Sequence, residues 1–141
     1  MNFSTHKTLV VQLQAGDTDP FPVLAHLDYD ASDPFAVTVA FSHEGRVLAR
    51  WRLDREMLAE GLTGPVGLGD VRLRPESSGT GKELRMEFFG DPLPGGGRHH
   101  AVVFAWAPTV SAFLSRTYEV VLPGQEEVEV DGFLAEVLAR G

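Results

Sequence analysis

Apolar and polar residues alternate along much of the chain up to residue 106, and this period of two is typical of strands that bury one face. The alternation predicts about seven strands, over residues 8–13, 23–29, 35–41, 47–53, 71–74, 84–89 and 100–106. A glycine-containing hairpin loop is expected at residues 42–45. The predicted inward faces of the two strands beside this loop hold Phe35, Val37, Val39 and Phe41, followed by Val47, Ala49, Trp51 and Leu53.

Helical spacing replaces the alternation at two places. Asp54 is predicted to cap a short helix that runs through Glu60, with Gly61 ending it in the left-handed conformation. Another helix is predicted from Pro108, because a residue without a backbone N–H suits the first turn. Its inward stripe consists of Val110, Phe113, Leu114, Thr117 and Tyr118.

The segments between these elements are rich in glycine and proline. Residues 63–69 and 91–97 are predicted to be loops, and Pro123-Gly124 to end the long helix. Asp131 is expected to cap a last helix. We find no internal repeat and no linker, so residues 1–141 are interpreted as one domain.

Composition narrows the possible functions. The chain has 141 residues, 43% of them apolar, and a net charge of −8, which argues against bulk binding to nucleic acid or to an anionic membrane. It contains no cysteine, which excludes disulfides, thiol nucleophiles and cysteine-bound metal clusters. The first 16 residues lack the apolar run of an export signal, and no apolar stretch is long enough to span a bilayer. We therefore expect a soluble cytoplasmic protein without membrane insertion.

The sequence contains few candidates for a catalytic, cofactor or metal site. The sequence at residues 79–82, Gly-Thr-Gly-Lys, lacks the other positions of a phosphate-binding loop and is interpreted as a hairpin turn. The aspartates at positions 28, 30 and 33 fit a turn with side-chain-to-backbone hydrogen bonds better than a calcium loop. The histidines are scattered or face opposite sides of a strand. We therefore predict no catalytic residue, no cofactor and no metal site.

Two pairs of arginines are the main candidates for a binding surface. Arg50 with Arg52, and Arg72 with Arg74, each place two guanidinium groups on one face of a strand. If the two strands lie close together, the pairs form a basic stripe for carboxylates or phosphates; otherwise they are solvated charges on an outer face. The surface of the short helix adds the candidates Arg55, Glu56 and Glu60.

Five motifs occur in a fixed order along the chain. Residues 27–37 match the pattern L-x-Y-D-x-x-D-P-Y/F-A-V, and residues 51–62 match W-x-F-A/D-R-D/E-L-L-x-E-G-L except for a leucine at position 53 and a methionine at position 57. Residues 65–72, 113–117 and 121–126 match P-x-G-x-G-D-V-R/x, F-L-x-R-T and V-x-P-G-x-E. Together these motifs resemble the SsgA-like proteins, sporulation and cell-division regulators of filamentous actinomycetes, and most closely the SsgB type.

The resemblance implies a fold, a function and partners. The family fold is an α+β fold similar to that of Whirly-type single-stranded nucleic-acid-binding proteins, with antiparallel sheets, helices and a trimeric assembly. This agrees with the predicted strands, the short middle helix and the C-terminal helices. The implied function is non-catalytic: selection of septum sites during sporulation, by bringing the tubulin-like protein FtsZ to future septa or promoting its assembly. The implied partners are FtsZ, other SsgA-like proteins and further copies of the chain.

An alternative function uses the same sheet to bind single-stranded nucleic acid. Such proteins need a cationic groove and aromatic side chains on which bases stack. The two arginine pairs would supply the charge, but Trp51 is predicted on the face opposite Arg50 and Arg52. The net charge also opposes this alternative.

Overall fold

The computed structural model describes residues 3–76 and 82–126, which form one antiparallel sheet and two helices. The strands follow the order β4-β3-β2-β1-β8-β7-β6-β5 across the sheet. Their bounds are β1 (Ser4–Ala15), β2 (Phe21–Asp30), β3 (Ala36–His43), β4 (Arg46–Asp54), β5 (Val66–Leu68), β6 (Val71–Glu76), β7 (Glu83–Pro92) and β8 (Arg98–Trp106). The helices are α1 (Arg55–Gly61) and α2 (Ala107–Val120). The expected α+β class with antiparallel strands is therefore confirmed.

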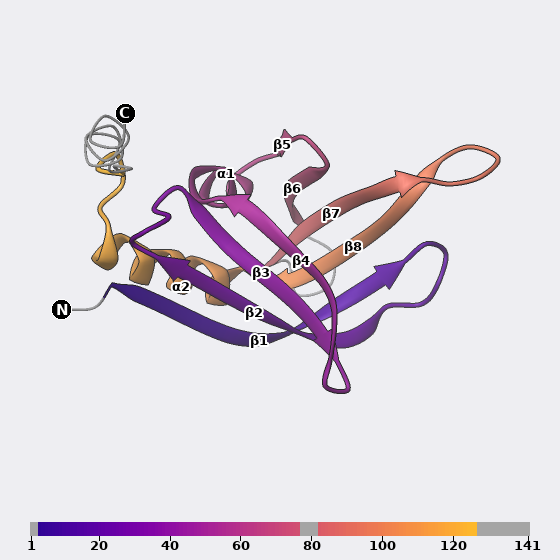
Figure 1. The fold of residues 1–141 in the computed structure, drawn as a ribbon, viewed down its shortest axis with the longest axis horizontal. Coiled ribbons are helices and arrows are strands. Elements are labelled where there is room, and N and C mark those ends of the chain that lie inside the picture. The colour runs from indigo at the N-terminus through magenta and orange to yellow at the C-terminus, as the bar shows by residue number, and fades with distance from the viewer. Residues whose placement is uncertain (1–2, 77–81, 127–141) are drawn as a thin grey trace, which may run out of the picture.

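The sheet curls so that its two halves face each other (Figure 1). Strands β1 and β8 pair only where residues 12–15 meet residues 101–104, and beyond that segment the halves diverge. Helix α2 packs against both of these strands. On the inner face, the ring of Phe88 on β7 lies 5.5 Å from that of Phe41 and 4.8 Å from that of Trp51. Strands far apart in the sheet thus share one core.

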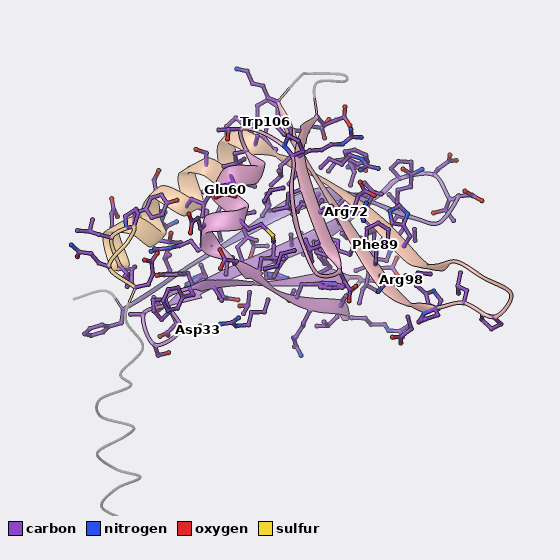
Figure 2. All side chains as sticks on the ribbon, turned by 90° about the horizontal axis from the view of Figure 1, so that it is seen from above. Asp33, Glu60, Arg72, Phe89, Arg98 and Trp106 are labelled. Atoms are coloured by element: carbon purple, nitrogen blue, oxygen red, sulfur yellow. The ribbon has the colours of Figure 1, made fainter. Side chains whose placement is uncertain are left out.

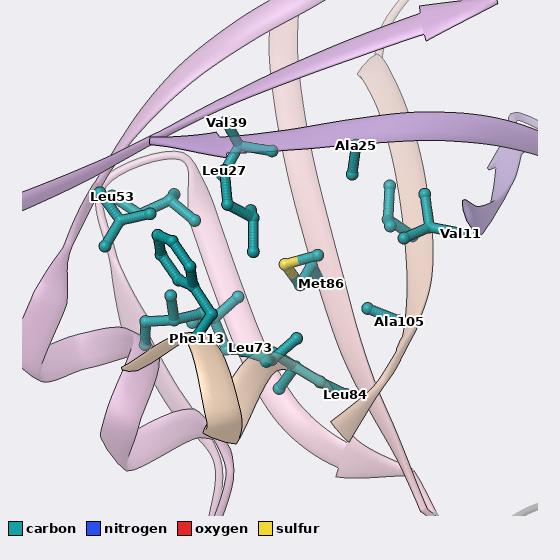
Figure 3. Packing of buried hydrophobic residues seen from close by; sticks show 14 of the residues in the cluster. Val11, Ala25, Leu27, Val39, Leu53, Leu73, Leu84, Met86, Ala105 and Phe113 are labelled. Carbon is teal, nitrogen blue, oxygen red and sulfur yellow. The ribbon is translucent and has the colours of Figure 1, made fainter. Parts of the chain in front are cut away.

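Alternating burial gives the strands their inward faces. In β2 the side chains of Val23, Ala25, Leu27 and Tyr29 are buried, whereas the intervening residues are exposed or half-buried. The same alternation gives β7 its inward face. Figure 3 shows these inward side chains packed with those of α2. The residues labelled in that view are Val11, Ala25, Leu27, Val39, Leu53, Leu73, Leu84, Met86, Ala105 and Phe113.

Three strand predictions need correction. The structure has an eighth strand, β5, inside the predicted loop at 63–69, because Gly69 adopts φ 60° and turns a three-residue segment back against β6. Phe35 precedes β3 and is 43% exposed, so it does not belong to the inward face. Val47 is 50% exposed, because the register of β3 and β4 shifts at Phe41/Ser42 and turns Val47 outward.

Helix α1 begins as predicted but ends differently. The carboxylate of Asp54 accepts a hydrogen bond from the backbone N–H of Met57 at 3.0 Å, which is the expected N-cap. Gly61, however, is helical and buried instead of left-handed. A Cβ atom at this position would lie 2.7 Å from the Cβ atom of Leu73, so the glycine allows α1 to approach β6.

Helix α2 follows its predicted pattern. Pro108 lies in its first turn, and Val110, Phe113, Leu114 and Thr117 are buried, with Tyr118 half-buried. The helix ends at Val120, before Pro123-Gly124. Neither helix in the described part of the chain is long and apolar enough to cross a membrane. The helix predicted from Asp131 and the turn at 79–81 lie outside the described residues.

Candidate functional site

A buried arginine is the centre of a polar cluster between α1 and the C-terminal end of α2. The side chain of Arg55, at the start of α1, is 2% exposed. Its guanidinium donates hydrogen bonds to the carbonyls of Thr117 at 3.2 Å and Val121 at 2.7 Å, and to the carboxylate of Glu126 at 2.5 Å. Its central carbon also lies 4.9 Å from the centre of the Tyr29 ring. Three segments that are distant in the sequence, around residues 29, 55 and 117–126, therefore meet at one side chain.

The cluster places a cation at the C-terminal end of α2, where the negative end of the helix dipole makes it favourable. The carbonyl of Thr117 also accepts the N–H of Val121 at 2.9 Å, so Arg55 is a second donor to it, and the carbonyl of Val121 lies just beyond the helix. The charge-assisted hydrogen bond from Arg55 holds the pKa of Glu126 below its ordinary value. Burial raises the pKa of Tyr29, whose hydroxyl donates to the carbonyl of Pro34 at 2.9 Å.

This ion pair predicts how stability depends on pH. A carboxyl group whose pKa is lower in the folded chain stabilises the fold above its ordinary pKa and loses that contribution as the pH falls. We therefore expect the stability difference between wild type and Glu126→Gln to be largest at pH 7 and to shrink below 4.5, the ordinary value for this group. Thermal denaturation of both proteins between pH 7 and about 3 measures this. Parallel pH dependences would contradict the assignment.

The buried cluster changes the interpretation of the sequence motifs. Tyr29, Arg55, Thr117 and Glu126 each come from a different motif, and all four meet here. The expectation that Arg55 lies on an exposed helix surface is wrong, because the C-terminal end of α2 covers its side chain. Four of the motifs thus contain residues whose contacts with one another stabilise the fold. The sequence pattern did not reveal this cluster, because its residues lie far apart along the chain.

The first arginine pair, on β4, is exposed as predicted. Arg52 makes two hydrogen bonds to the carboxylate of Asp33, at 2.7 and 3.1 Å. The same turn contains the expected side-chain-to-backbone bond, from the N–H of Ser32 to Asp30. Arg50 is exposed on the same strand face. The charge of Arg52 is therefore already matched within the chain.

The second pair, Arg72 and Arg74, is exposed on the outer face of β6. The guanidinium of Arg72 lies 5.2 Å from the centre of the Phe89 ring, and that of Arg98 lies 5.8 Å from it (Figure 2). Arg98 is held by the carboxylate of Asp70 at 2.7 Å. The ring of His100 stacks on Phe89 at 4.8 Å. This face thus carries a cluster of cationic and aromatic side chains that the sequence analysis did not predict.

Beside this cluster, Glu87 is the acidic group of the outer face. Partial burial raises the pKa of Glu87, but hydrogen bonds from His100 and Arg85 outweigh it, so the pKa lies below its ordinary value. His100 is 3.0 Å from this carboxylate, and Arg85 is in direct contact with it. The charge of Glu87 is therefore compensated by its neighbours.

The two arginine pairs do not form one stripe. Strand β4 is at one edge of the sheet, and five strands separate it from β6. The inner faces of β4 and β7 approach each other through Trp51 and Phe88, so the outward arginines point away from each other. The condition for a shared basic stripe, that the strands lie close side by side, is not met.

The remaining candidates lie on the surface of α1. Glu56 and Glu60 are exposed, as predicted. Among the described residues, no three histidine, aspartate or glutamate side chains are arranged to hold a metal ion. The polar groups of the described chain thus form two kinds of structure, a buried cluster at Arg55 and charged outer faces.

The fold and its motif residues define the class to which the chain belongs. The family model described as Streptomyces sporulation and cell division protein, SsgA, matches residues 23–126. This span is well over half of the chain and includes all four residues of the buried cluster. The protein belongs to the SsgA family.

Individual relatives are similar over almost their whole length. The sporulation-specific cell division protein SsgB of Saccharopolyspora erythraea is 38% identical over 133 residues, covering 93% of this chain and 89% of the relative. SsgB of Streptomyces coelicolor is 33% identical over 142 residues, covering 99% of each.

Two solved structures have the same fold. The SsgA-like sporulation-specific cell division protein of Thermobifida fusca gives a TM-score of 0.76 at 34% identity, covering 98% of this chain and 96% of that one. A second structure comes from work on SsgB mutations that correlate with longitudinal cell division during sporulation of Streptomyces coelicolor. It gives a TM-score of 0.74 at 34% identity, covering 89% of this chain and 94% of that one.

Proposed function

We propose that this protein is a regulator of sporulation-specific cell division that acts at the division septum. The observation that carries the proposal is the near full-length similarity to proteins named for that process, with the motif residues of the buried cluster in place. Its finer form is that the protein selects septum sites by recruiting FtsZ or promoting FtsZ assembly. Its partners are then FtsZ and other SsgA-like proteins.

The action we propose is non-catalytic. A catalytic site needs a nucleophile, base or metal converging on one pocket with perturbed pKa values. Where the described carboxyl groups have lowered pKa values, they pair with arginine, histidine or backbone groups that stabilise the fold or its surface. This arrangement favours a protein that acts through docking.

Self-assembly is part of the proposal, with a trimer as the expected form. Val10 and Leu24 are neighbours across β1 and β2 on the outer face, 61% and 42% exposed. Exposed apolar side chains next to each other favour burial against another chain. A closed assembly would multiply weak contacts with a polymer such as FtsZ filaments. Light scattering coupled to size exclusion measures the number of copies.

Complementation tests the proposed role. In an actinomycete whose SsgB gene has been deleted, we expect expression of this chain to restore sporulation septa and a fluorescent fusion to lie at them. With purified components, we expect it to increase the FtsZ that sediments as polymer, alone or with a membrane-linked partner. An unrelated acidic protein of similar size is the control for crowding in the sedimentation assay.

The proposal fails if the expressed, folded chain restores no septa and changes FtsZ sedimentation in no combination. Restored septa without any effect on FtsZ would retain the division role and remove FtsZ as its target. The alternative of single-stranded nucleic-acid binding, and with it a Whirly-like use of the sheet, has less support because the two arginine pairs lie on separated strands.

A further inference from the structure

A hollow of about 550 Å³ opens on the outer face where β5, β6 and β7 lie side by side. Arg72, Arg74 and Arg85 line it together with Glu87 and Gly67. Three guanidinium groups around one hollow are unexpected in a chain of net charge −8. The hollow lies next to the Phe89 ring, which fixes the place of Arg72.

The cations of this hollow differ in how far they are already paired. Arg85 is in direct contact with Glu87, so its charge is matched. Arg74 is 3.9 Å from Glu76, at the limit of an ion pair, and its side chain is 53% exposed. Among the described residues, Arg72 has no ion pair, although Glu87 stands opposite it across β6 and β7; its guanidinium lies over the face of Phe89. Arg72 and Arg74 therefore keep donors available for a ligand.

Gly67 keeps the hollow open above these donors. It pairs with Arg72 across β5 and β6, so a side chain there would stand on the same outer face. A Cβ atom at this position would lie 3.3 Å from the Cγ atom of Arg72. A larger side chain would extend over the guanidinium. The glycine and the contact with Phe89 together present Arg72 in a defined and accessible position.

We propose that this hollow binds an acidic extended segment of a protein partner, through carboxylates two residues apart. Residues two apart on a strand share one face and are spaced by about 6.6 Å, because each residue advances about 3.3 Å. Arg72 and Arg74 have this relation, and so do alternate glutamates of an extended peptide. Each guanidinium can then bind one carboxylate with two hydrogen bonds. The inference deepens the proposed function, because it assigns the chemistry of a contact on which docking would rest.

Carboxylates fit the hollow better than a nucleic-acid backbone. Glu87 lines the hollow and Glu76 lies 3.9 Å from Arg74, so there is room for two matched carboxylates at Arg72 and Arg74, whereas a continuous row of phosphates would place further negative charges against these glutamates. The available donors are limited to two neighbouring guanidiniums, whereas a single strand of nucleic acid needs a cationic track with several stacking rings. Arg50 and Arg52 repeat the same spacing on β4, but Asp33 already occupies Arg52.

Peptide binding tests the proposal. The probe is a fluorescent peptide in which glutamate alternates with valine, and anisotropy is measured at low salt with the full chain. We expect binding that weakens with salt and falls about tenfold or more in the double variant Arg72→Ala/Arg74→Ala. Arg50→Ala removes an exposed arginine elsewhere and should leave binding unchanged. The matching peptide with glutamine in place of glutamate should not bind.

A second variant separates shape from charge. Gly67→Leu fills the hollow without changing the net charge and should also weaken peptide binding, with an unchanged unfolding temperature as the control for folding. The proposal is overturned if the peptide does not bind or if the double variant binds it as wild type does. It is also overturned if a labelled single-stranded oligonucleotide binds more tightly and depends on the same arginines. The division role is tested separately, by complementation with the wild-type chain. A failure of peptide binding would therefore contradict the proposed contact and not the division role.

Discussion

Replacing Arg55 with alanine should destabilise the protein by about 3–5 kcal/mol, the usual cost of removing one partner of a buried ion pair. The substitution leaves the carbonyl of Val121, just after α2, and the carboxylate of Glu126 without this donor. It also leaves a space between the rings of Tyr29 and Tyr118, which lie 4.9 and 5.0 Å from the guanidinium carbon. Since most small domains have a total stability of about 5–15 kcal/mol, we expect a large unfolded fraction.

Arg55→Lys should recover only part of this loss. An ammonium group keeps the charge but has no planar fork to reach the carbonyls and the carboxylate together. Urea denaturation followed by circular dichroism measures both variants at pH 7. The control is Arg52→Ala, which breaks the exposed pair with Asp33 and should cost at most about 1 kcal/mol. If Arg55→Ala cost no more than this control, the central role of the buried cluster would be wrong.

Replacing Gly61 with alanine should also destabilise the protein, although alanine favours helices. Alanine in a helix is normally better than glycine by about 1 kcal/mol. Here, however, the new methyl group would lie 2.7 Å from the Cβ atom of Leu73, which is 2% exposed. Moving α1 away from β6 would disturb a packed core, at an overpacking cost of about 1–3 kcal/mol. We therefore expect a net loss.

Gly64 supplies the matched control for this prediction. It lies three residues further on, and a Cβ atom there would meet no heavy atom within 4 Å. Gly64→Ala should therefore be neutral or slightly stabilising, because it only restricts the unfolded chain. Both unfolding free energies come from the same denaturation experiment. An unfolding free energy for Gly61→Ala at or above that of wild type would show that α1 has room to shift.

Much of the secondary structure could be predicted because its signals are local. Period-two alternation predicted the strands β2, β6 and β7, and a capping aspartate predicted the start of α1. The predictions failed where one residue departs from the period. A shift of register between β3 and β4 turned Val47 outward, and a left-handed Gly69 made a strand within an apparent loop.

The candidate site was harder to predict, because the side chains that form it are distant in the sequence. Exposure was correct for Arg50, Arg52, Arg72 and Arg74, since alternation decides which strand face a residue occupies. Alternation does not tell which strands are neighbours, and so the shared basic stripe remained open until the strand order was known. The Phe89 cluster on β6, β7 and β8 likewise depends on that order.

The sequence alone determined most of the strands, both helices of the described chain and, through ordered motifs, the family. The tertiary structure decided what the motif residues do. In the sequence, Arg55 looks like any other charged residue on a short helix. Only the packing of the end of α2, 62 or more residues further along the chain, buries it and gives it carbonyl and carboxylate partners. Local patterns depend on neighbours along the chain, whereas burial and pairing of charge depend on which distant segments pack together.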